Sequence, residues 1–278
     1  MEQKPISMIA IDLDGTLLTD DKRITRGNAE AIREAMDAGY RVCIATGRAW
    51  PGAKEFVTAL GIDTPVVTSN GAMIVNPLGE EVLFDLGLSE EEAKEIYALG
   101  EQIPEVTQIV WSKCQCYASR MNDQAADYGN RFGRMKPEPV PSIEELCERG
   151  VSKILWYFSD DSADSHAPTM IERFGDRVTV ETSTPFFLEF FHLGLSKAEA
   201  VKFVADRYGI GMERVLAIGD AGNDVPILRM AGIGVAMANA SEPARTAADY
   251  VTGNNNQDGV AEAIRKFCPC DRIKTRNM

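Results

Sequence analysis

Histidine is scarce in this sequence, and its scarcity limits the hydrolytic chemistry that is available. Only His166 and His192 occur among 278 residues, and neither lies in the local context of a serine or cysteine nucleophile. A Ser-His-Asp hydrolase needs an imidazole as its general base, so this class of enzyme is disfavoured. We interpret both histidines as structural or exposed side chains.

Basic residues are outnumbered by acidic ones. Lysine and arginine total 29 against 42 aspartates and glutamates, which gives a formal net charge of −13 and a pI near 4.7. Binding to nucleic acid depends on basic side chains that neutralise phosphates, so no nucleic-acid partner is expected. A small anionic ligand is compatible with this charge, because a metal ion and a few basic side chains set the field inside a site.

Long apolar runs are absent as well. The run Met8–Leu18 contains two aspartates, which the core of a secretory signal does not tolerate. The run Met230–Ala240 is rich in glycine and too short to cross a bilayer. We therefore expect a cytoplasmic protein with no membrane partner, and the pattern specifies no oligomeric state.

The six cysteines do not form the usual metal-binding pattern. Cys114 and Cys116 are separated by one residue, as are Cys268 and Cys270, and neither pair has a histidine partner nearby. A zinc knuckle has a different spacing. Reduced thiols, which are typical of the cytosol, are therefore expected.

Predicted strands and helices alternate at both ends of the chain. Met8–Leu13 has the pattern of a buried strand, a helix is predicted over Asn28–Ala38, and strands follow at Arg41–Thr46 and Pro65–Ser69. The same alternation returns over residues 197–267. It is typical of a parallel sheet with helices on both faces. The sequence thus predicts a doubly wound, Rossmann-like α/β core.

The middle of the chain mixes helices and β-rich runs in a different way. Ser89 and Ser142 each begin a predicted helix with a capping box, and Lys153–Phe158 is an example of a β-rich run. This pattern predicts an α+β domain inserted between the two halves of the core. The polar tail after Cys270 is expected to be frayed. The predicted limits are residues 1–84 and 190–278 for the core and residues 85–189 for the inserted domain.

The first candidate site motif is Asp12–Thr16, at the end of the first predicted strand. Its two aspartates, two residues apart before a glycine turn, suit a nucleophile and a second group that reaches the leaving oxygen. A loop that caps the next helix is the plain alternative. A calcium loop of the EF-hand type is excluded, because Thr16 and Leu17 occupy the positions that require Asp or Asn and then Gly.

Three further motifs lie at or beside other strand ends. Thr46–Arg48 offers a hydroxyl and backbone N–H groups for phosphate oxygens, and Lys197 lies at the positive end of a helix dipole. Gly219–Asp224 carries two carboxylates and an amide, which suit magnesium. Each alone also fits an ordinary turn, a surface lysine or a helix N-cap. Because all four follow the carboxyl edge of one sheet, where parallel sheets bind ligands, we expect a single shared site.

The order of these motifs resembles that of the haloacid dehalogenase-like phosphatases. The position of the insertion, after the third strand, is similar to that in the Cof-type branch of this family. The runs Ser69–Ala72 and Gly234–Asn239 fit that branch too. The resemblance covers the core and the position of the inserted cap domain.

The resemblance implies the roles of the site residues. Asp12 would attack phosphorus and form a phospho-aspartyl intermediate, and Asp14 would act as general acid and then as general base. The implied cofactor is Mg²⁺, held by Asp12, the backbone carbonyl of Asp14 and Asp220, with Asp224 in support. The groups implied to hold phosphate oxygens are the backbone N–H of Leu13, Thr46, Gly47, Lys197 and Asn223.

The expected partner is a small phosphorylated metabolite, with a sugar phosphate favoured. The inserted domain, together with Arg48 and Asn70 at its junction with the core, is expected to select the substrate. A phosphomutase with the same phospho-aspartyl chemistry is the alternative enzyme. A regulatory module that only binds a phosphorylated ligand has no need of both Asp12 and Asp14.

Overall fold

A computed structural model describes residues 5–133 and 135–269. Within them the chain divides into two compact units. The core unit comprises the residues up to Gly47, Ala53–Glu81, and the residues from Ser196 onward. The inserted unit comprises Arg48–Gly52 and Val82–Leu195. That residues 85–189 form an independent domain stays a prediction, and Cys270 and the tail after it lie outside the described residues.

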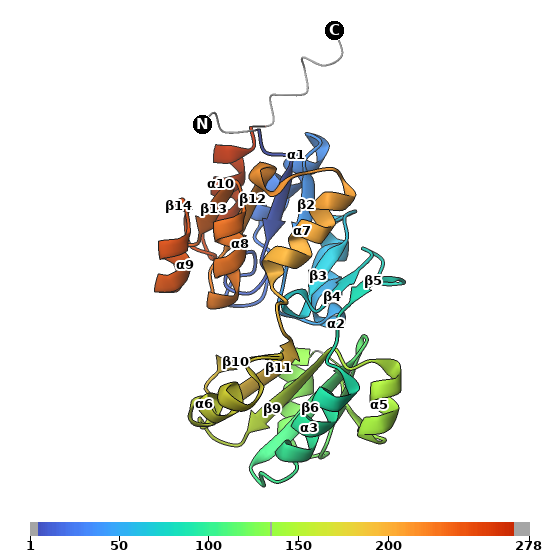
Figure 1. Ribbon diagram of the computed structural model, residues 1–278. Helices are drawn as coiled ribbons and strands as arrows, with labels where there is room; N and C mark the ends of the chain where they lie inside the picture. Colours follow the sequence, from blue (N-terminus) through green and yellow to red (C-terminus); the bar gives the residue numbers. More distant parts are fainter. Residues whose placement is uncertain (1–4, 134, 270–278) are drawn as a thin grey trace. The chain divides into compact units, whose positions relative to one another are not determined.

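The core unit is built on a parallel sheet with the strand order β14-β13-β12-β1-β2 (Figure 1). Every residue of β1 and of β12 is buried, as expected of strands covered on both faces. The predicted doubly wound α/β core is therefore confirmed. The strands are β1 (Met8–Ile11), β2 (Arg41–Ile44), β12 (Val215–Gly219), β13 (Ile233–Ala236) and β14 (Tyr250–Val251).

A short hairpin continues the core unit beyond β2. Its strands β3 (Val66–Thr68) and β4 (Met73–Val75) pair in an antiparallel manner, and a single parallel bridge joins Ala45 to Val67. The turn between them is the 3-10 helix η1 (Ser69–Gly71). This hairpin brings the residues after β3 to the same edge of the sheet as the end of β2.

The carboxyl ends of β1 and β12 form a topological switch point. The chain moves from β1 to β2 in one direction and from β12 to β13 in the other, so right-handed crossovers place the following helices on opposite faces. In agreement, α1 packs beside α10 and α7 packs beside α8. Open α/β sheets bind ligands outside such a point. The helices are α1 (Arg26–Asp37), α2 (Trp50–Leu60), α7 (Lys197–Arg207), α8 (Val225–Met230), α9 (Glu242–Ala247) and α10 (Gly259–Phe267).

Local sequence signals account for the ends of these helices. The hydroxyl of Thr25 accepts a hydrogen bond from the N–H of Asn28 at the start of α1, as an N-cap does. At the other end of α1, Gly39 adopts a left-handed φ of 85°, which favours glycine. Ser196 caps α7 in the same way, through the N–H of Glu199.

The inserted unit contains a second sheet, with the strand order β10-β11-β9-β6-β7-β8. Its pairs are antiparallel except for β7 with β8. The predicted capping box of Ser89 and Glu92 is present at the start of α3. The elements are β5 (Val82–Asp85), α3 (Glu90–Gly100), β6 (Val106–Ser112), β7 (Gln115–Ala118), α4 (Asp123–Tyr128), β8 (Glu138–Pro139), α5 (Ile143–Arg149), β9 (Lys153–Phe158), α6 (Ala163–Phe174), β10 (Val178–Thr184) and β11 (Phe187–His192).

Two hydrophobic clusters lie in the inserted unit. One contains Trp156 and Phe190, and the other contains Trp111, Tyr128 and Phe187. Phe187 and Phe190 are three residues apart on β11, so strand alternation sends them to opposite faces of the sheet. The phenylalanines of this segment are therefore packing residues.

Among the described residues, no helix combines the length and apolar character that a membrane crossing requires. The five cysteines in this part of the chain are free thiols.

Candidate active site

Asp12 lies at the switch point, directly after β1. Its backbone N–H donates to the carbonyl of Ile218 at 3.1 Å, which continues the pairing with β12. The residue is only 6% exposed. Burial therefore raises the pKa of Asp12 well above its ordinary value, although the charge of Lys197 acts in the opposite direction.

Lys197, the first residue of α7, is buried against two carboxylates. Its Nζ lies 2.6 Å from Asp12 Oδ1 and 2.7 Å from Asp224 Oδ1. Burial alone lowers the pKa of Lys197, but the charges of Asp12 and Asp224 outweigh that effect and raise it. The side chain is therefore held as an ammonium ion between the two carboxylates.

Asp224 organises the loop that follows β12. Its Oδ2 accepts from the backbone N–H groups of Asp220 and Ala221, both at 3.0 Å. A Cβ at Gly219 would lie 2.6 Å from the Asp224 Cβ, so glycine is needed for this close approach. Both oxygens of Asp224 are thus engaged, which fits a supporting role for this residue.

Asp220 is oriented by the Asp12–Thr16 motif. The Thr16 hydroxyl donates to Asp220 Oδ1 at 2.7 Å. Gly15 has a φ of 76°, and a Cβ there would lie 2.8 Å from the Asp220 Cγ. Burial raises the pKa of Asp220 to about 6, and the bond from Thr16 opposes this rise. The role of Thr16 was not predicted from the sequence, although its hydroxyl follows shortly after the two aspartates.

The three carboxylates form a group that fits a divalent cation. One oxygen from each of Asp12, Asp220 and Asp224 lies within 4.8 Å of the others. Lys197 is the only cation paired with them among the described residues, so three carboxyl groups share one ammonium. Among those residues, Asp12 Oδ2 and Asp220 Oδ2 accept no hydrogen bond. A cation with oxygen ligands suits this arrangement.

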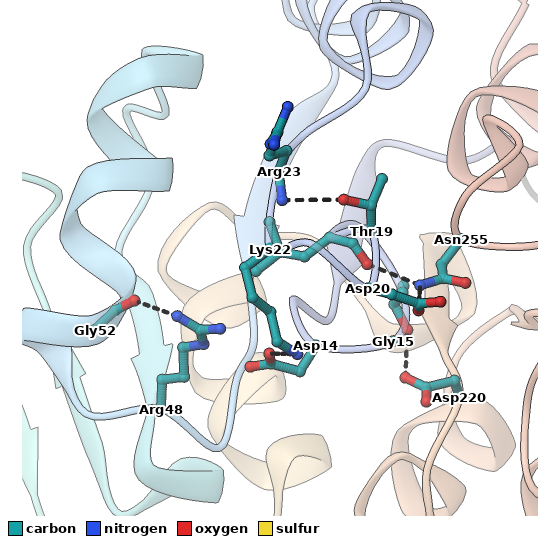
Figure 2. A network of polar contacts seen from close by, with 12 residues as sticks. Asp14, Gly15, Thr19, Asp20, Lys22, Arg23, Arg48, Gly52, Asp220 and Asn255 are labelled. Atoms are coloured by element: carbon teal, nitrogen blue, oxygen red, sulfur yellow. Dashed lines mark hydrogen bonds and ion pairs between the residues drawn. The ribbon is translucent and has the colours of Figure 1, made fainter. Parts of the chain in front are cut away.

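Asp14 is more exposed than Asp12 and has a different partner. Its Oδ1 lies 2.8 Å from the Lys22 ammonium, and the two side chains are 40% and 47% exposed. Figure 2 shows them facing one another. No sequence pattern predicted a role for Lys22, which is one of several polar residues before the first helix.

Four of the residues predicted to bind phosphate or substrate contact one another near the end of β2: Thr46, Gly47, Asn70 and Asn223. The carbonyl of Thr46 accepts from the N–H of Asn70 at 3.1 Å, and a Cβ at Gly47 would lie 2.8 Å from Asn70 Oδ1. That oxygen accepts from Asn223 Nδ2 at 2.9 Å. The buried Asn223 Oδ1 has no partner among the described residues. Asn223 therefore presents an acceptor oxygen here, and one of the two N–H donors of its amide is engaged by Asn70.

Leu13 has a buried side chain, and its carbonyl accepts from the N–H of Leu18 at 2.8 Å. Arg48 belongs to the inserted unit, where its guanidinium donates to the carbonyl of Gly52 at 3.0 Å. The structure thus brings the predicted residues of the core unit together, whereas Arg48 belongs to the inserted unit.

The fold and the acidic switch-point site define a hydrolase class. The sequence model of the haloacid dehalogenase-like hydrolases matches residues 9–264, and the chain belongs to this family, in its Cof-type branch. The predicted family and enzyme class, a phosphoric monoester hydrolase, are confirmed.

Individual phosphatases and solved structures are similar to this chain over nearly its whole length. The 5-amino-6-(5-phospho-D-ribitylamino)uracil phosphatase YcsE of Bacillus subtilis is 32% identical, over 96% of this chain and 97% of the relative. A haloacid dehalogenase-like hydrolase from Bacteroides thetaiotaomicron has a TM-score of 0.84 and 28% identity, over 94% of this chain and 99% of its own. The subclass IIB sugar phosphatase BT4131 has a TM-score of 0.79 and 28% identity, over 94% and 98% of the two chains.

Proposed function

We propose that this chain is a Mg²⁺-dependent phosphatase that hydrolyses small phosphorylated metabolites through a phospho-aspartyl intermediate on Asp12. The observation that carries the proposal is the contact of the buried Asp12 with the buried Lys197. The ammonium lies 2.6 Å from an oxygen of Asp12, so it holds the proposed nucleophile in place and offsets its negative charge.

The first step transfers the phosphoryl group to the chain. An oxygen of Asp12 attacks phosphorus, the ester P–O bond breaks, and Asp14 donates a proton to the leaving alcohol oxygen. Lys197 offsets the negative charge that accumulates around the phosphoryl oxygens. Phosphoryl transfer depends chiefly on this kind of positioning and charge stabilisation.

The second step restores the enzyme. Water attacks phosphorus, Asp14 accepts a proton from that water, and the bond between phosphorus and the Asp12 oxygen breaks. Inorganic phosphate leaves and Asp12 returns to its carboxylate form. Asp14 thus gains in the second step the proton that it gave in the first, as general acid–base catalysis requires.

The residues that would hold Mg²⁺ are Asp12, Asp220 and the backbone carbonyl of Asp14, with Asp224 supporting the loop. When bound, Mg²⁺ would supply charge neutralisation at the transferred phosphoryl group. The excess of carboxylates over ammonium groups supports this assignment. Thr46, Gly47, Lys197 and Asn223, with the N–H of Leu13, would hold phosphate oxygens.

The substrate proposal draws on the relatives. Two of them are named for a ribityl phosphate and for sugar phosphates, which are phosphate esters of alcohols. An alkoxide is a poor leaving group, so a substrate of this kind makes full use of a general acid at Asp14. We favour sugar or polyol phosphates, selected by the inserted unit together with Arg48 and Asn70.

The test is a hydrolysis panel of sugar phosphates, a ribityl phosphate and p-nitrophenyl phosphate, with Mg²⁺ and with excess chelator. Phosphate release that requires Mg²⁺ and needs no bisphosphate activator is expected. The phospho-enzyme should be found by mass spectrometry on the peptide that contains Asp12. Turnover that depends on a bisphosphate would favour the phosphomutase, and a phosphorylated residue other than Asp12 would overturn the nucleophile assignment.

A further inference from the structure

The segment after Gly15 forms a compact turn that carries Lys22 toward Asp14. Within this turn the N–H of Thr19 donates to the carbonyl of Arg23 at 2.9 Å, and the N–H of Lys22 donates to the carbonyl of Thr19 at 2.8 Å. The Thr19 hydroxyl accepts from the N–H of Arg23 at 3.1 Å. Lys22 itself has a left-handed φ of 59°, which is uncommon outside glycine. The turn holds the lysine in this conformation.

A distant part of the core unit anchors the same turn through Asp20. The side-chain amide of Asn255 donates to Asp20 Oδ1 at 3.1 Å, and that of Asn256 donates to Oδ2 at the same distance. The backbone N–H of Asp20 donates a hydrogen bond to Asn256 Oδ1 at 3.1 Å. These side-chain hydrogen bonds lower the pKa of Asp20. Figure 2 shows Asp20 beside Asn255.

Asn255 is the fixed point of this arrangement. It is 2% exposed, and its side chain also donates to the carbonyl of Leu18 at 3.0 Å. Leu18 forms bridges with Asp14 on one side and Ile24 on the other. One buried amide therefore ties together the strand-like segment beside Asp14 and the turn that bears Lys22.

We propose that Lys22 is a positioning residue for Asp14, an inference that rests on the acid–base role of Asp14 proposed above. A carboxylate that is 40% exposed has several rotamers available in water. The ammonium at 2.8 Å holds Oδ1 and so restricts the orientation of the carboxyl group that donates the proton. Lys22 does not touch the phosphoryl group in this scheme; it acts by selecting one orientation of Asp14.

Stability alone does not account for this arrangement. An exposed ion pair contributes only about 0–1 kcal/mol, and a surface lysine needs neither a left-handed backbone nor a buried anchor. Placement of a proton donor is much more sensitive to geometry, since small displacements can cost on the order of 10²-fold in rate.

The experiment compares two esters of similar size and very different leaving groups. Benzyl phosphate expels a strongly basic alkoxide, whereas p-nitrophenyl phosphate expels a stable phenolate. In Lys22→Met we expect kcat/KM on benzyl phosphate to fall on the order of 10–10²-fold, with a loss of less than about threefold on p-nitrophenyl phosphate. Lys22→Arg should restore most of the rate on benzyl phosphate.

Lys202→Met is the matched control. Lys202 lies 2.7 Å from Asp206, is 48% exposed and belongs to the same unit. The substitution therefore removes an equivalent ion pair at a distance from the site. It should leave both esters unaffected. In an Asp14→Asn background, Lys22→Met should cause no additional loss on benzyl phosphate, because the residue that it positions is already disabled.

The outcomes separate the two proposals. If Asp14→Asn loses rate selectively on benzyl phosphate and Lys22→Met loses rate equally on both esters, the positioning role is wrong and the proposed function stands. Additive losses in the double variant would also overturn the positioning role. If Asp14→Asn shows no selectivity, the acid role of Asp14 fails and this inference fails with it.

Discussion

The hydroxyl of Thr16 lies 2.7 Å from Asp220 Oδ1, although 204 residues separate the two in the chain. This contact joins the turn after β1 to the turn after β12, so it fixes one carboxylate of the acidic group relative to another. The hydroxyl donates a hydrogen bond to Asp220 Oδ1, whereas Oδ2 accepts no hydrogen bond from the described residues. Ligand orientation in the proposed Mg²⁺ site therefore depends on a side chain that is not itself an expected ligand.

Thr16→Val should weaken Mg²⁺ binding. The substitution keeps the shape and removes the donor, and loss of such an orienting partner typically costs about 10–100-fold in metal affinity. Isothermal titration with Mg²⁺ measures this directly. Thr64→Val is the control, because Thr64 is equally buried and donates to the carbonyl of Val42 in the same unit. Equal Mg²⁺ affinity in both variants would contradict the orienting role of Thr16.

Asp12→Asn should abolish turnover without unfolding the protein. An amide fits the same space and can still accept from Lys197, but it does not attack phosphorus. Steady-state hydrolysis of p-nitrophenyl phosphate, together with circular dichroism, checks both parts. Asp206→Asn, which alters an exposed partner of Lys202, should retain full activity. Substantial turnover in a cleanly purified Asp12→Asn protein would refute the nucleophile assignment.

Asp220→Asn should separate the stability of the metal-free protein from its response to Mg²⁺. Burial raises the pKa of Asp220 to about 6, so ionisation at neutral pH destabilises the fold and removal of the charge should raise the melting temperature without metal. In the wild type, Mg²⁺ at a hundred times its Kd should add about 2.7 kcal/mol. The variant should show a much smaller increase. A full Mg²⁺ response in the variant would exclude Asp220 as a ligand.

Lys197→Met should be strongly destabilising in the absence of Mg²⁺. The substitution leaves Asp12 and Asp224 buried with no ammonium, and breaking a buried pair in this way costs about 3–5 kcal/mol. Lys153→Met makes the corresponding change in the inserted unit, where Lys153 lies 2.6 Å from Glu189 and both are 8% exposed. Urea unfolding should show comparable losses. Hydrolysis of p-nitrophenyl phosphate should disappear only in Lys197→Met, and its survival there would contradict the proposed role.

The pair of arginines on Glu95 predicts a pH-dependent contribution to stability. Hydrogen bonds from Arg177 and then Arg173 lower the pKa of Glu95 from its ordinary value of 4.5. A lowered carboxyl pKa means that the stabilisation is complete above that value and is lost as the pH falls through the folded-state pKa. Glu95→Gln should therefore be less stable at pH 7 by less than about 1 kcal/mol. Urea unfolding should show this difference vanish in acid, and a difference that persists there would rule out the charge as its cause.

Much of the site was predictable because its residues follow strand ends. The alternation of strands and helices identified the sheet edge, and Asp12, Lys197 and Asp220 all lie where that edge predicts. Short sequence motifs at the strand ends are sufficient to locate these residues. The prediction of a single shared site in the core unit follows from topology and needs no knowledge of side-chain rotamers.

The contacts that the sequence did not reveal depend on register and loop conformation. The bond from Thr16 to Asp220 requires β1 and β12 to be neighbours with Ile11 opposite Ile218, which no local pattern specifies. The contact of Lys22 with Asp14 depends on a left-handed residue and on Asn255, more than two hundred positions away. The same limitation applies to the hydrogen bond from the Asn223 amide to Asn70.

The pairing of β1 with β12 also has a consequence for synthesis on the ribosome. β1 can pair with β2 early, but its other neighbour begins at Val215, opposite Met8. At about 5–20 residues per second, that neighbour is made roughly 10–40 s later. The whole inserted unit emerges in the meantime, while one edge of an entirely apolar strand has no partner. Such an edge is a template for association with other chains, so the nascent protein is most prone to aggregate, and most dependent on chaperones, during this interval.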